Sequence, residues 1–173
     1  MNSNLILTVI GDDRPGLVSE LAAAISSHQG NWVESAMSNL AGKFAGIVRV
    51  AVPEANEAAL QRALSGLTGL IVAAESSGEK VRPKGRRLKL SLVGHDRIGI
   101  VREVSQVLAC HAVNVEELTT RTASAPMSAE ILFYADAELL AGPDLDTRAL
   151  AADLERISAE FMVDIDLAEA LKM

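Results

Sequence analysis

The chain has 173 residues, a formal net charge of −7 and 49% hydrophobic residues. This content suits one medium core or two small ones. No apolar run approaches the roughly 18 to 20 residues of a membrane span, and no charged segment followed by an apolar one opens the chain. We therefore expect a globular protein of the cytoplasm that does not enter a membrane. The lone cysteine, Cys110, has no internal disulfide partner and is expected to be a small buried thiol on a helix.

The first elements are a strand and a helix joined by a glycine-rich loop. Alternating apolar positions at 5, 7 and 9 predict the strand, and the segment from Gly11 to Gly16 breaks it, with Pro15 suited to a first helical turn. Apolar positions 17, 18, 21, 24 and 25 follow a helical stripe that ends at Gly30. Gly30 is expected to cap this helix in the left-handed conformation.

A hairpin, a second helix and a last strand follow. Strands at about 32–40 and 44–52 are joined by the tight hairpin Leu40-Ala41-Gly42-Lys43, and Pro53 stops the second of them. A helix is predicted from Glu54 to Leu67, and the apolar segment 70–74 is typical of a buried strand. The order is strand, helix, strand, strand, helix, strand.

The same order is repeated in the second half of the chain. The segment Val9 to Val18 returns 83 positions later as Leu92 to Val101, and the offset also pairs Glu20 with Glu103, His28 with His111 and Asn31 with Asn114. In the second repeat we expect strands near 88–94, 114–123, 128–137 and 163–169, helices near 98–111 and 146–161, and one inserted loop over 137–144.

This order predicts an α+β protein of two tandem ferredoxin-like units, each a βαββαβ fold whose four antiparallel strands carry both helices on one face. The expected divisions are a first domain over 1–79, a basic linker over 80–89 and a second domain over 90–173. The bare face of each sheet needs cover, from the other repeat or from a second chain, so a homo-oligomer is expected.

The segment 80–89 holds six basic residues and also Pro83 and Gly85, which argue against regular structure. Three interpretations are open for it: a solvated linker, a docking patch for an acidic partner, or a nucleic-acid patch. Direct nucleic-acid binding is not expected, because both repeats are acidic and the aromatic cluster needed for base stacking is missing.

The loop from Gly11 to Leu17 is the candidate site. It ends at a helix N-terminus, where free N–H groups and the helix dipole favour a carboxylate or a phosphate. Asp13 and Asn31 can offer acceptors to an ammonium group, and the two features together fit an α-amino acid. The alternative is purely structural: Gly11 and Gly16 make the turn, Asp13 caps the helix and Arg14 lies on the surface.

The run Gly-Asp-Asp-Arg-Pro-Gly-Leu-Val, with Asn31 beyond the helix, resembles the ACT domain of amino-acid sensors. This resemblance implies a ferredoxin-like fold and a small amino-acid ligand, serine or glycine, held at an interface between two domains. Two residue types depart from the family pattern: an acid at Asp13 and Asp96, where Asn is frequent, and Ile98 in place of proline. The implied ligand-binding positions are Asp12, Asp13, Arg14, Pro15, Gly16, Leu17 and Asn31 in the first repeat, and Asp96, Arg97, Ile98, Gly99, Ile100 and Asn114 in the second.

Four further runs resemble the glycine cleavage system transcriptional repressor family: 35–44, 114–122, Ala125-Pro126-Met127-Ser128 and 161–165. This resemblance implies a non-enzymatic regulator that senses an amino acid and acts through a regulatory protein partner rather than on DNA. The open alternatives are a regulatory subunit of an amino-acid biosynthetic enzyme, a ligandless protein-interaction module, and a small enzyme that uses Asp13 or His95.

Catalysis has little support, since the chain lacks a P-loop lysine and the motifs Cys-x-x-Cys, His-Glu-x-x-His and Gly-x-Ser-x-Gly. His28 and His111 fall at equivalent helix ends, where a cation is favoured by the dipole. We therefore expect no catalytic residue, no metal site and no cofactor.

Overall fold

The computed structural model describes residues 2–78, 84–125 and 130–169 of the chain. It divides into two compact units, Met1–Val81 and Arg82–Met173, and each is described by itself. Unit 1 consists of β1 (Asn2–Asp12), α1 (Leu17–Ser27), β2 (Asn31–Leu40), β3 (Lys43–Pro53), α2 (Glu54–Ser65) and β4 (Leu70–Ser77). Unit 2 consists of β5 (Arg86–His95), α3 (Ile100–Cys110), β6 (Asn114–Ser124), β7 (Ile131–Ala141), α4 (Thr147–Phe161) and β8 (Val163–Glu169).

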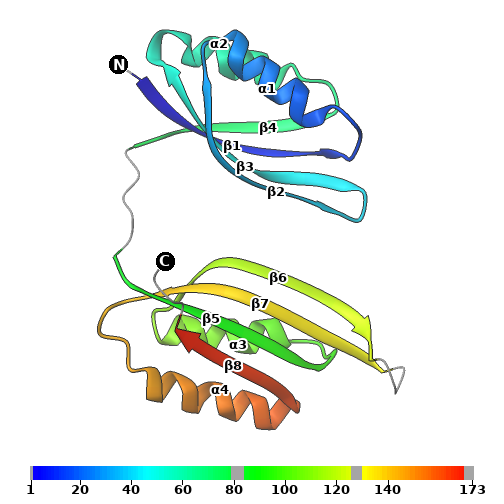
Figure 1. Ribbon diagram of the computed structural model, residues 1–173, viewed down its shortest axis with the longest axis vertical. Coiled ribbons are helices and arrows are strands. Elements are labelled where there is room, and N and C mark those ends of the chain that lie inside the picture. Colours follow the sequence, from blue (N-terminus) through cyan, green and yellow to red (C-terminus); the bar gives the residue numbers. More distant parts are fainter. Residues whose placement is uncertain (1, 79–83, 126–129, 170–173) are drawn as a thin grey trace. The chain divides into compact units, whose positions relative to one another are not determined.

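Each unit is a four-stranded antiparallel sheet with both of its helices on one face (Figure 1). The strand order is β2-β3-β1-β4 in unit 1 and β6-β7-β5-β8 in unit 2, which is the ferredoxin-like arrangement. The predicted fold class, two tandem βαββαβ units, is confirmed. None of the described helices is long and apolar enough to cross a membrane.

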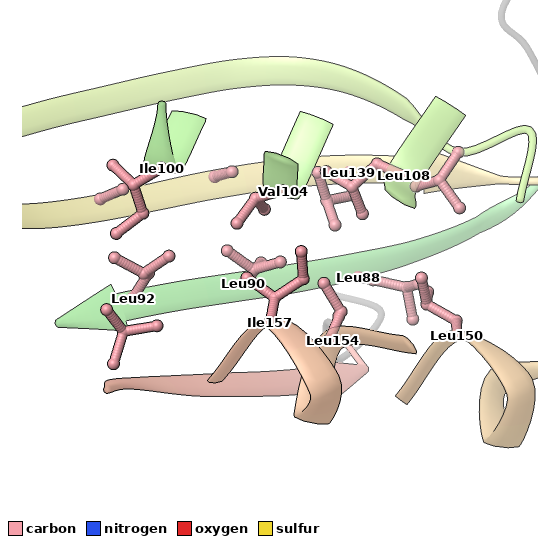
Figure 2. Packing of buried hydrophobic residues seen from close by; sticks show 14 of the residues in the cluster. Leu88, Leu90, Leu92, Ile100, Val104, Leu108, Leu139, Leu150, Leu154 and Ile157 are labelled. Atoms are coloured by element: carbon pink, nitrogen blue, oxygen red, sulfur yellow. The ribbon is translucent and has the colours of Figure 1, made fainter. Parts of the chain in front are cut away.

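The two cores lie between sheet and helices and use equivalent positions. In unit 1 the inward side chains of β1, Leu5, Leu7 and Val9, are almost fully buried against α1 and α2. In unit 2 the residues 83 positions later, Leu88, Leu90 and Leu92, take the same places. Figure 2 shows their side chains directed toward those of the two helices, such as Leu108 and Leu154. The alternation read from the sequence therefore assigns the correct face of the central strand in both units.

The turn of the first hairpin is as predicted. Strand β2 ends at Leu40, β3 begins at Lys43, and both turn residues, Ala41 and Gly42, have positive φ angles of 51° and 79°. This geometry matches the twist of the two strands. Pro53 closes β3 and directly precedes α2.

The left-handed residue after α1 is Gln29, with φ 59°, and the expectation that Gly30 has this role is wrong. Gly30 is required for a different reason. A Cβ atom on Gly30 would lie 2.8 Å from Ile25 Cγ2 and 3.2 Å from Val50 Cγ1, so the packing of the helix end on the sheet leaves no room for a side chain.

The expectation for Cys110 is also wrong, because its side chain is exposed. The buried stripe of α3 consists of Ile100, Val104 and Leu108. Cys110 is the last residue of the helix, two positions beyond this stripe, and therefore faces away from the core.

Two segments expected to be irregular are partly strand. Strand β5 begins at Arg86, so the end of the basic segment 80–89 is part of the second sheet, while residues 79–83 lie outside the described residues. There Arg86 pairs with Glu169, Arg87 with Glu116, and Lys89 lies 3.6 Å from Glu138. Strand β7 extends to Ala141, which shortens the inserted loop predicted over 137–144. The Pro126-Met127-Ser128 part of the signature run lies outside the described residues.

Candidate ligand site

The loop between β1 and α1 is shaped by two glycines with separate roles. At Gly11 an added Cβ would lie 2.3 Å from the carbonyl oxygen of Gly69, so the end of β1 can pass this chain segment only without a side chain. Gly16 has φ 95°, a conformation that L side chains rarely adopt, and is the N-cap of α1. Its carbonyl accepts the first helical hydrogen bond, from Glu20 N at 2.9 Å.

Asp13 does not cap the N-terminus of α1, although the purely structural interpretation of the loop predicts that it does. Asp13 Oδ2 accepts a hydrogen bond from the Asn39 side chain at the end of β2, and its backbone N–H donates to Gly42 O at 2.9 Å. Gly16 offers no side chain to the N–H groups of the first turn. The helix end therefore retains the positive partial charge that favours an anion.

The charged residues of the loop are paired with neighbours. Arg14 Nη1 and Nη2 donate to the two carboxylate oxygens of Glu20 at 2.6 and 2.8 Å, and Nη2 also lies 3.3 Å from Thr68 O. These hydrogen bonds lower the pKa of Glu20 and raise that of Arg14. Asp12 accepts from Lys43, which lowers the pKa of Asp12. Both acids are thus held in the ionised form at neutral pH.

A shallow hollow of about 230 Å³ opens beside this loop. It brings together the helix N-terminus, the Asp13 carboxylate and an apolar wall, within the size range of a small amino acid. Its lining residues are Asp13, Arg14, Gly16, Leu17, Val18, Ser19 and Phe44.

Asn31 lies at the opposite end of the sheet. In the sheet register Asp12 pairs with Lys43, whereas Asn31 pairs with Ala51, which in turn pairs with Asn4 of β1. Eight residues of extended chain separate Asn4 from Asp12, a distance on the order of 25 Å. Asp13 and Asn31 therefore do not converge within one unit.

The second loop repeats the backbone of the first but not its ion pair. Gly99 has φ 96° and is the N-cap of α3, as Gly16 is of α1. Glu103, the counterpart of Glu20, pairs with Arg102 at the start of α3, and Ile98 is fully exposed where the first repeat has proline. Asp96 N donates to Ile131 O at 3.2 Å.

Asn114 is separated from the second loop in the same way as Asn31 is from the first. It pairs with Leu140, whose partner on β5 is Arg87, at the far end of β5 from His95. The repeated register thus places the two asparagines at equivalent ends of the two sheets.

The three histidines have different surroundings. His28 Nδ1 lies 2.8 Å from Ala24 O, His111 Nε2 lies 2.7 Å from Asp153 Oδ2, and His95 Nδ1 lies 3.9 Å from Glu130 Oε2. Within residues 2–78, 84–125 and 130–169, no group of three or more His, Cys, Asp or Glu side chains is arranged to hold a metal ion.

Sequence analysis missed the contribution of the β2–β3 hairpin to this site. Asn39 and Lys43 hold Asp13 and Asp12, and Phe44 forms part of the wall of the hollow. Only the register identifies these residues, because it places Lys43 opposite Asp12. The repeat places Glu103 at the position equivalent to Glu20, which is a signal that this position matters. It does not reveal that Glu20 binds the arginine of its own loop whereas Glu103 binds Arg102.

Comparison with known proteins agrees with the fold of the two units. Residues 3–69 match the ACT domain family. A protein of unknown function from Galdieria sulphuraria has 31% sequence identity and a TM-score of 0.85, over 99% of this chain and 100% of that one. A proposed glycine cleavage system transcriptional repressor has 15% identity and a TM-score of 0.74, over 99% of both chains, which shows a common fold across both units. No curated protein sequence matches the chain.

Proposed function

We propose that this chain, whose residues 3–69 match the ACT domain family, whose second unit repeats the same fold, and which belongs to the same family as the Galdieria sulphuraria protein, is a non-enzymatic regulator that responds to a small amino acid. Glycine and serine are the favoured ligands. The output is contact with a regulatory protein partner in the cytoplasm rather than with DNA, as the resemblance to the glycine cleavage system transcriptional repressor family implies. The observation that carries the proposal is the uncapped N-terminus of α1 beside the Asp13 carboxylate.

The two charged groups of an amino acid match the two sides of the hollow. Its carboxylate is favoured at the free N–H groups of the first turn of α1, which typically contributes about 0.3 to 1 kcal/mol and up to about 2 kcal/mol when partly buried. Its ammonium group is a donor for the Asp13 carboxylate, next to the Asn39 amide. A small side chain fits against Leu17 and Phe44.

The expected affinity is modest. Glycine has five heavy atoms, and a ceiling near −1.5 kcal/mol per atom gives at best about −7.5 kcal/mol, which corresponds to a few micromolar. An open hollow binds more weakly, so dissociation constants in the high micromolar range are expected. A coupling of about 1 to 3 kcal/mol between ligand and partner is enough to switch a complex.

Asn31 enters this proposal as a contact from a second unit. A ligand at the β1–α1 loop of one unit is about a strand length away from Asn31 of the same unit. An amino acid that uses both positions therefore joins two units, which gives it a means to favour one packing of units over another. Asn114 with Asp96, Arg97, Ile98, Gly99 and Ile100 forms the corresponding set in the second repeat.

Isothermal titration calorimetry of the full chain against glycine, serine and other amino acids tests the proposal, with Gly16→Leu and Gly99→Leu as a matched pair. Both glycines have φ near 95°, so the two substitutions impose similar backbone strain. Binding that is lost in Gly16→Leu and retained in Gly99→Leu supports a site in the first repeat. The absence of binding heat with every amino acid would reject the sensor.

The main alternative is a regulatory subunit of an amino-acid biosynthetic enzyme. It predicts stable co-purification with a catalytic chain, whereas the favoured function predicts a partner whose association changes with the amino acid. Affinity purification with and without glycine at about 10 mM, which is roughly ten times the expected dissociation constant or more, separates these two outcomes.

A further inference from the structure

The sheet of unit 1 has an outer face, on the side not covered by α1 and α2, with a pronounced apolar patch. Ile10, Ile47 and Ile71 on this face are 43%, 55% and 74% exposed. Ala45 and Ala73 lie among them, because Ala45 and Ile71 both pair with Ile10, and Ile47 and Ala73 both pair with Thr8. We call these five residues, Ile10, Ala45, Ile47, Ile71 and Ala73, the outer patch.

The fold does not require an apolar surface there. In unit 2 the position equivalent to Ile47 is Asp136. Ser91 is the residue 83 positions after Thr8, and Asp136 pairs with Ser91 as Ile47 pairs with Thr8. Likewise Asp166 pairs with Ser91 where Ala73 pairs with Thr8. The same backbone thus tolerates acids at these positions, so the fold alone does not explain why unit 1 has aliphatic residues there.

Charges border the outer patch at one end. Arg49 of β3 and Glu75 of β4 both pair with Ile6 of β1, so they flank the central strand in the same row. Arg49 Nε lies 3.1 Å from Glu34 Oε1, and Glu75 is exposed. The two strands that carry Arg49 and Glu75 are about 9.6 Å apart, twice the usual strand spacing.

We propose that two copies of the chain pack this face against each other, related by a two-fold axis that runs along β1. A two-fold axis in this position places β3 of each copy over β4 of the other, at the same level along the strands. Arg49 of one copy then faces Glu75 of the second copy, and the contact occurs twice. The row of Arg49 and Glu75 is therefore complementary in charge to itself.

The same operation matches the patch in shape. Ile47 of one copy lies over Ala73 of the second copy, and Ile71 over Ala45, so that these large side chains meet small ones, while Ile10 on the axis meets Ile10 of the second copy. Alternation of large and small residues is how two sheets about 10 Å apart fill the space between them. β1, β3 and β4 are the strands nearest the axis, so the roughly 30° crossing angle of packed sheets displaces these rows least.

The size of the face predicts a reversible dimer. Only β3, β1 and β4 face strands of the second copy about this axis, and three strands about 4.8 Å apart and about 25 Å long give a footprint of roughly 360 Å², below the about 800 Å² per partner of a standard interface. Exchange between monomer and dimer at micromolar concentration is therefore expected. The dimer does not depend on the proposed amino-acid response, and it is measured without added ligand.

Sedimentation velocity of the full chain over a hundredfold concentration range tests the proposal. The wild type should shift from monomer to dimer, and Ile47→Asp with Ala73→Asp, which copies unit 2, should remain monomeric with an unchanged circular dichroism spectrum. Thr119→Asp adds an acid to the outer face of the other sheet and should dimerise normally. A wild type that stays monomeric, or a double variant that dimerises as well as the wild type, overturns the proposal.

A charge exchange tests the geometry of the contact. Arg49→Glu should weaken the dimer because it places two carboxylates opposite each other, and Arg49→Glu combined with Glu75→Arg should restore part of the association. If the combined variant is no better than Arg49→Glu alone, the axis along β1 is wrong and the proposal as stated fails. A protein that is dimeric through another surface would be insensitive to all of these changes.

Discussion

Arg14 and Glu20 form a two-pronged ion pair, with Nη1 to Oε1 at 2.6 Å and Nη2 to Oε2 at 2.8 Å, across the entrance to α1. The guanidinium group is therefore engaged by the protein although Arg14 lines the hollow beside Gly16. In the second repeat Arg102, and not the loop arginine, is paired with Glu103. The ion pair of the first loop thus holds the Arg14 guanidinium group against Glu20.

Glu20→Gln is expected to strengthen binding of an amino acid by several-fold. The substitution releases Arg14 from its carboxylate partner and leaves the guanidinium group to attract the ligand carboxylate, next to the N-terminus of α1. Titration calorimetry at low and high salt measures the effect, which should be larger at low salt. Glu103→Gln is the control and should leave binding unchanged. Weaker binding by Glu20→Gln would mean that the ion pair holds the loop in its binding shape.

Asp153 should contribute to the pH dependence of the stability of unit 2. His111 Nε2 donates to Asp153 at 2.7 Å and Arg156 also donates to it, and these bonds, that of His111 foremost, lower the pKa of Asp153 below its ordinary 3.8. A lowered carboxyl pKa stabilises the folded state above the unfolded pKa, and this contribution is lost as the pH falls through the folded pKa.

Thermal unfolding between about pH 5 and pH 2 measures this contribution. The melting temperature of the wild type should fall more steeply toward low pH than that of Asp153→Asn, whose side chain does not titrate. At neutral pH the variant should be less stable than the wild type, because the amide accepts more weakly from His111. Parallel curves for the two proteins would show that Asp153 does not contribute to the acid sensitivity.

Leu150→Ala should destabilise unit 2 by about 2 to 5 kcal/mol. Leu150 is fully buried at the start of α4, against the core that β5 and β7 provide. Urea unfolding followed by circular dichroism measures the loss. Leu40→Ala is the control, because Leu40 is largely exposed at the end of β2, and its effect should stay below about 0.5 kcal/mol. A similar loss in both variants would contradict the assignment of Leu150 to the core.

The fold was predictable because its signals are local. The period-two alternation at Leu5, Leu7 and Val9 and the 83-residue repeat define strands, helices and their order, and the structure agrees with them. The site was predictable only in part. The sequence identifies the glycine loop, but the pairing of Asp13 with Asn39 depends on the register of the hairpin. Proximity of Asn31 to Asp13 was expected from chain order, whereas helix α1 carries the chain to the other end of the sheet.

Gly30→Val should destabilise unit 1 by about 1 to 3 kcal/mol, the usual cost of overpacking. The second repeat has Val113 at this position, with the same backbone bond to the helix end: Gly30 N donates to Ile25 O at 2.9 Å, and Val113 N to Leu108 O at 2.9 Å. In unit 1 a Cβ at residue 30 would meet Ile25 O at 2.9 Å. Urea unfolding of Gly30→Val against Val113→Ala compares the two sites: Val113→Ala should also destabilise, because Val113 is buried. A stable Gly30→Val protein would mean that the end of α1 shifts freely, and that valine was excluded from unit 1 for a reason other than space.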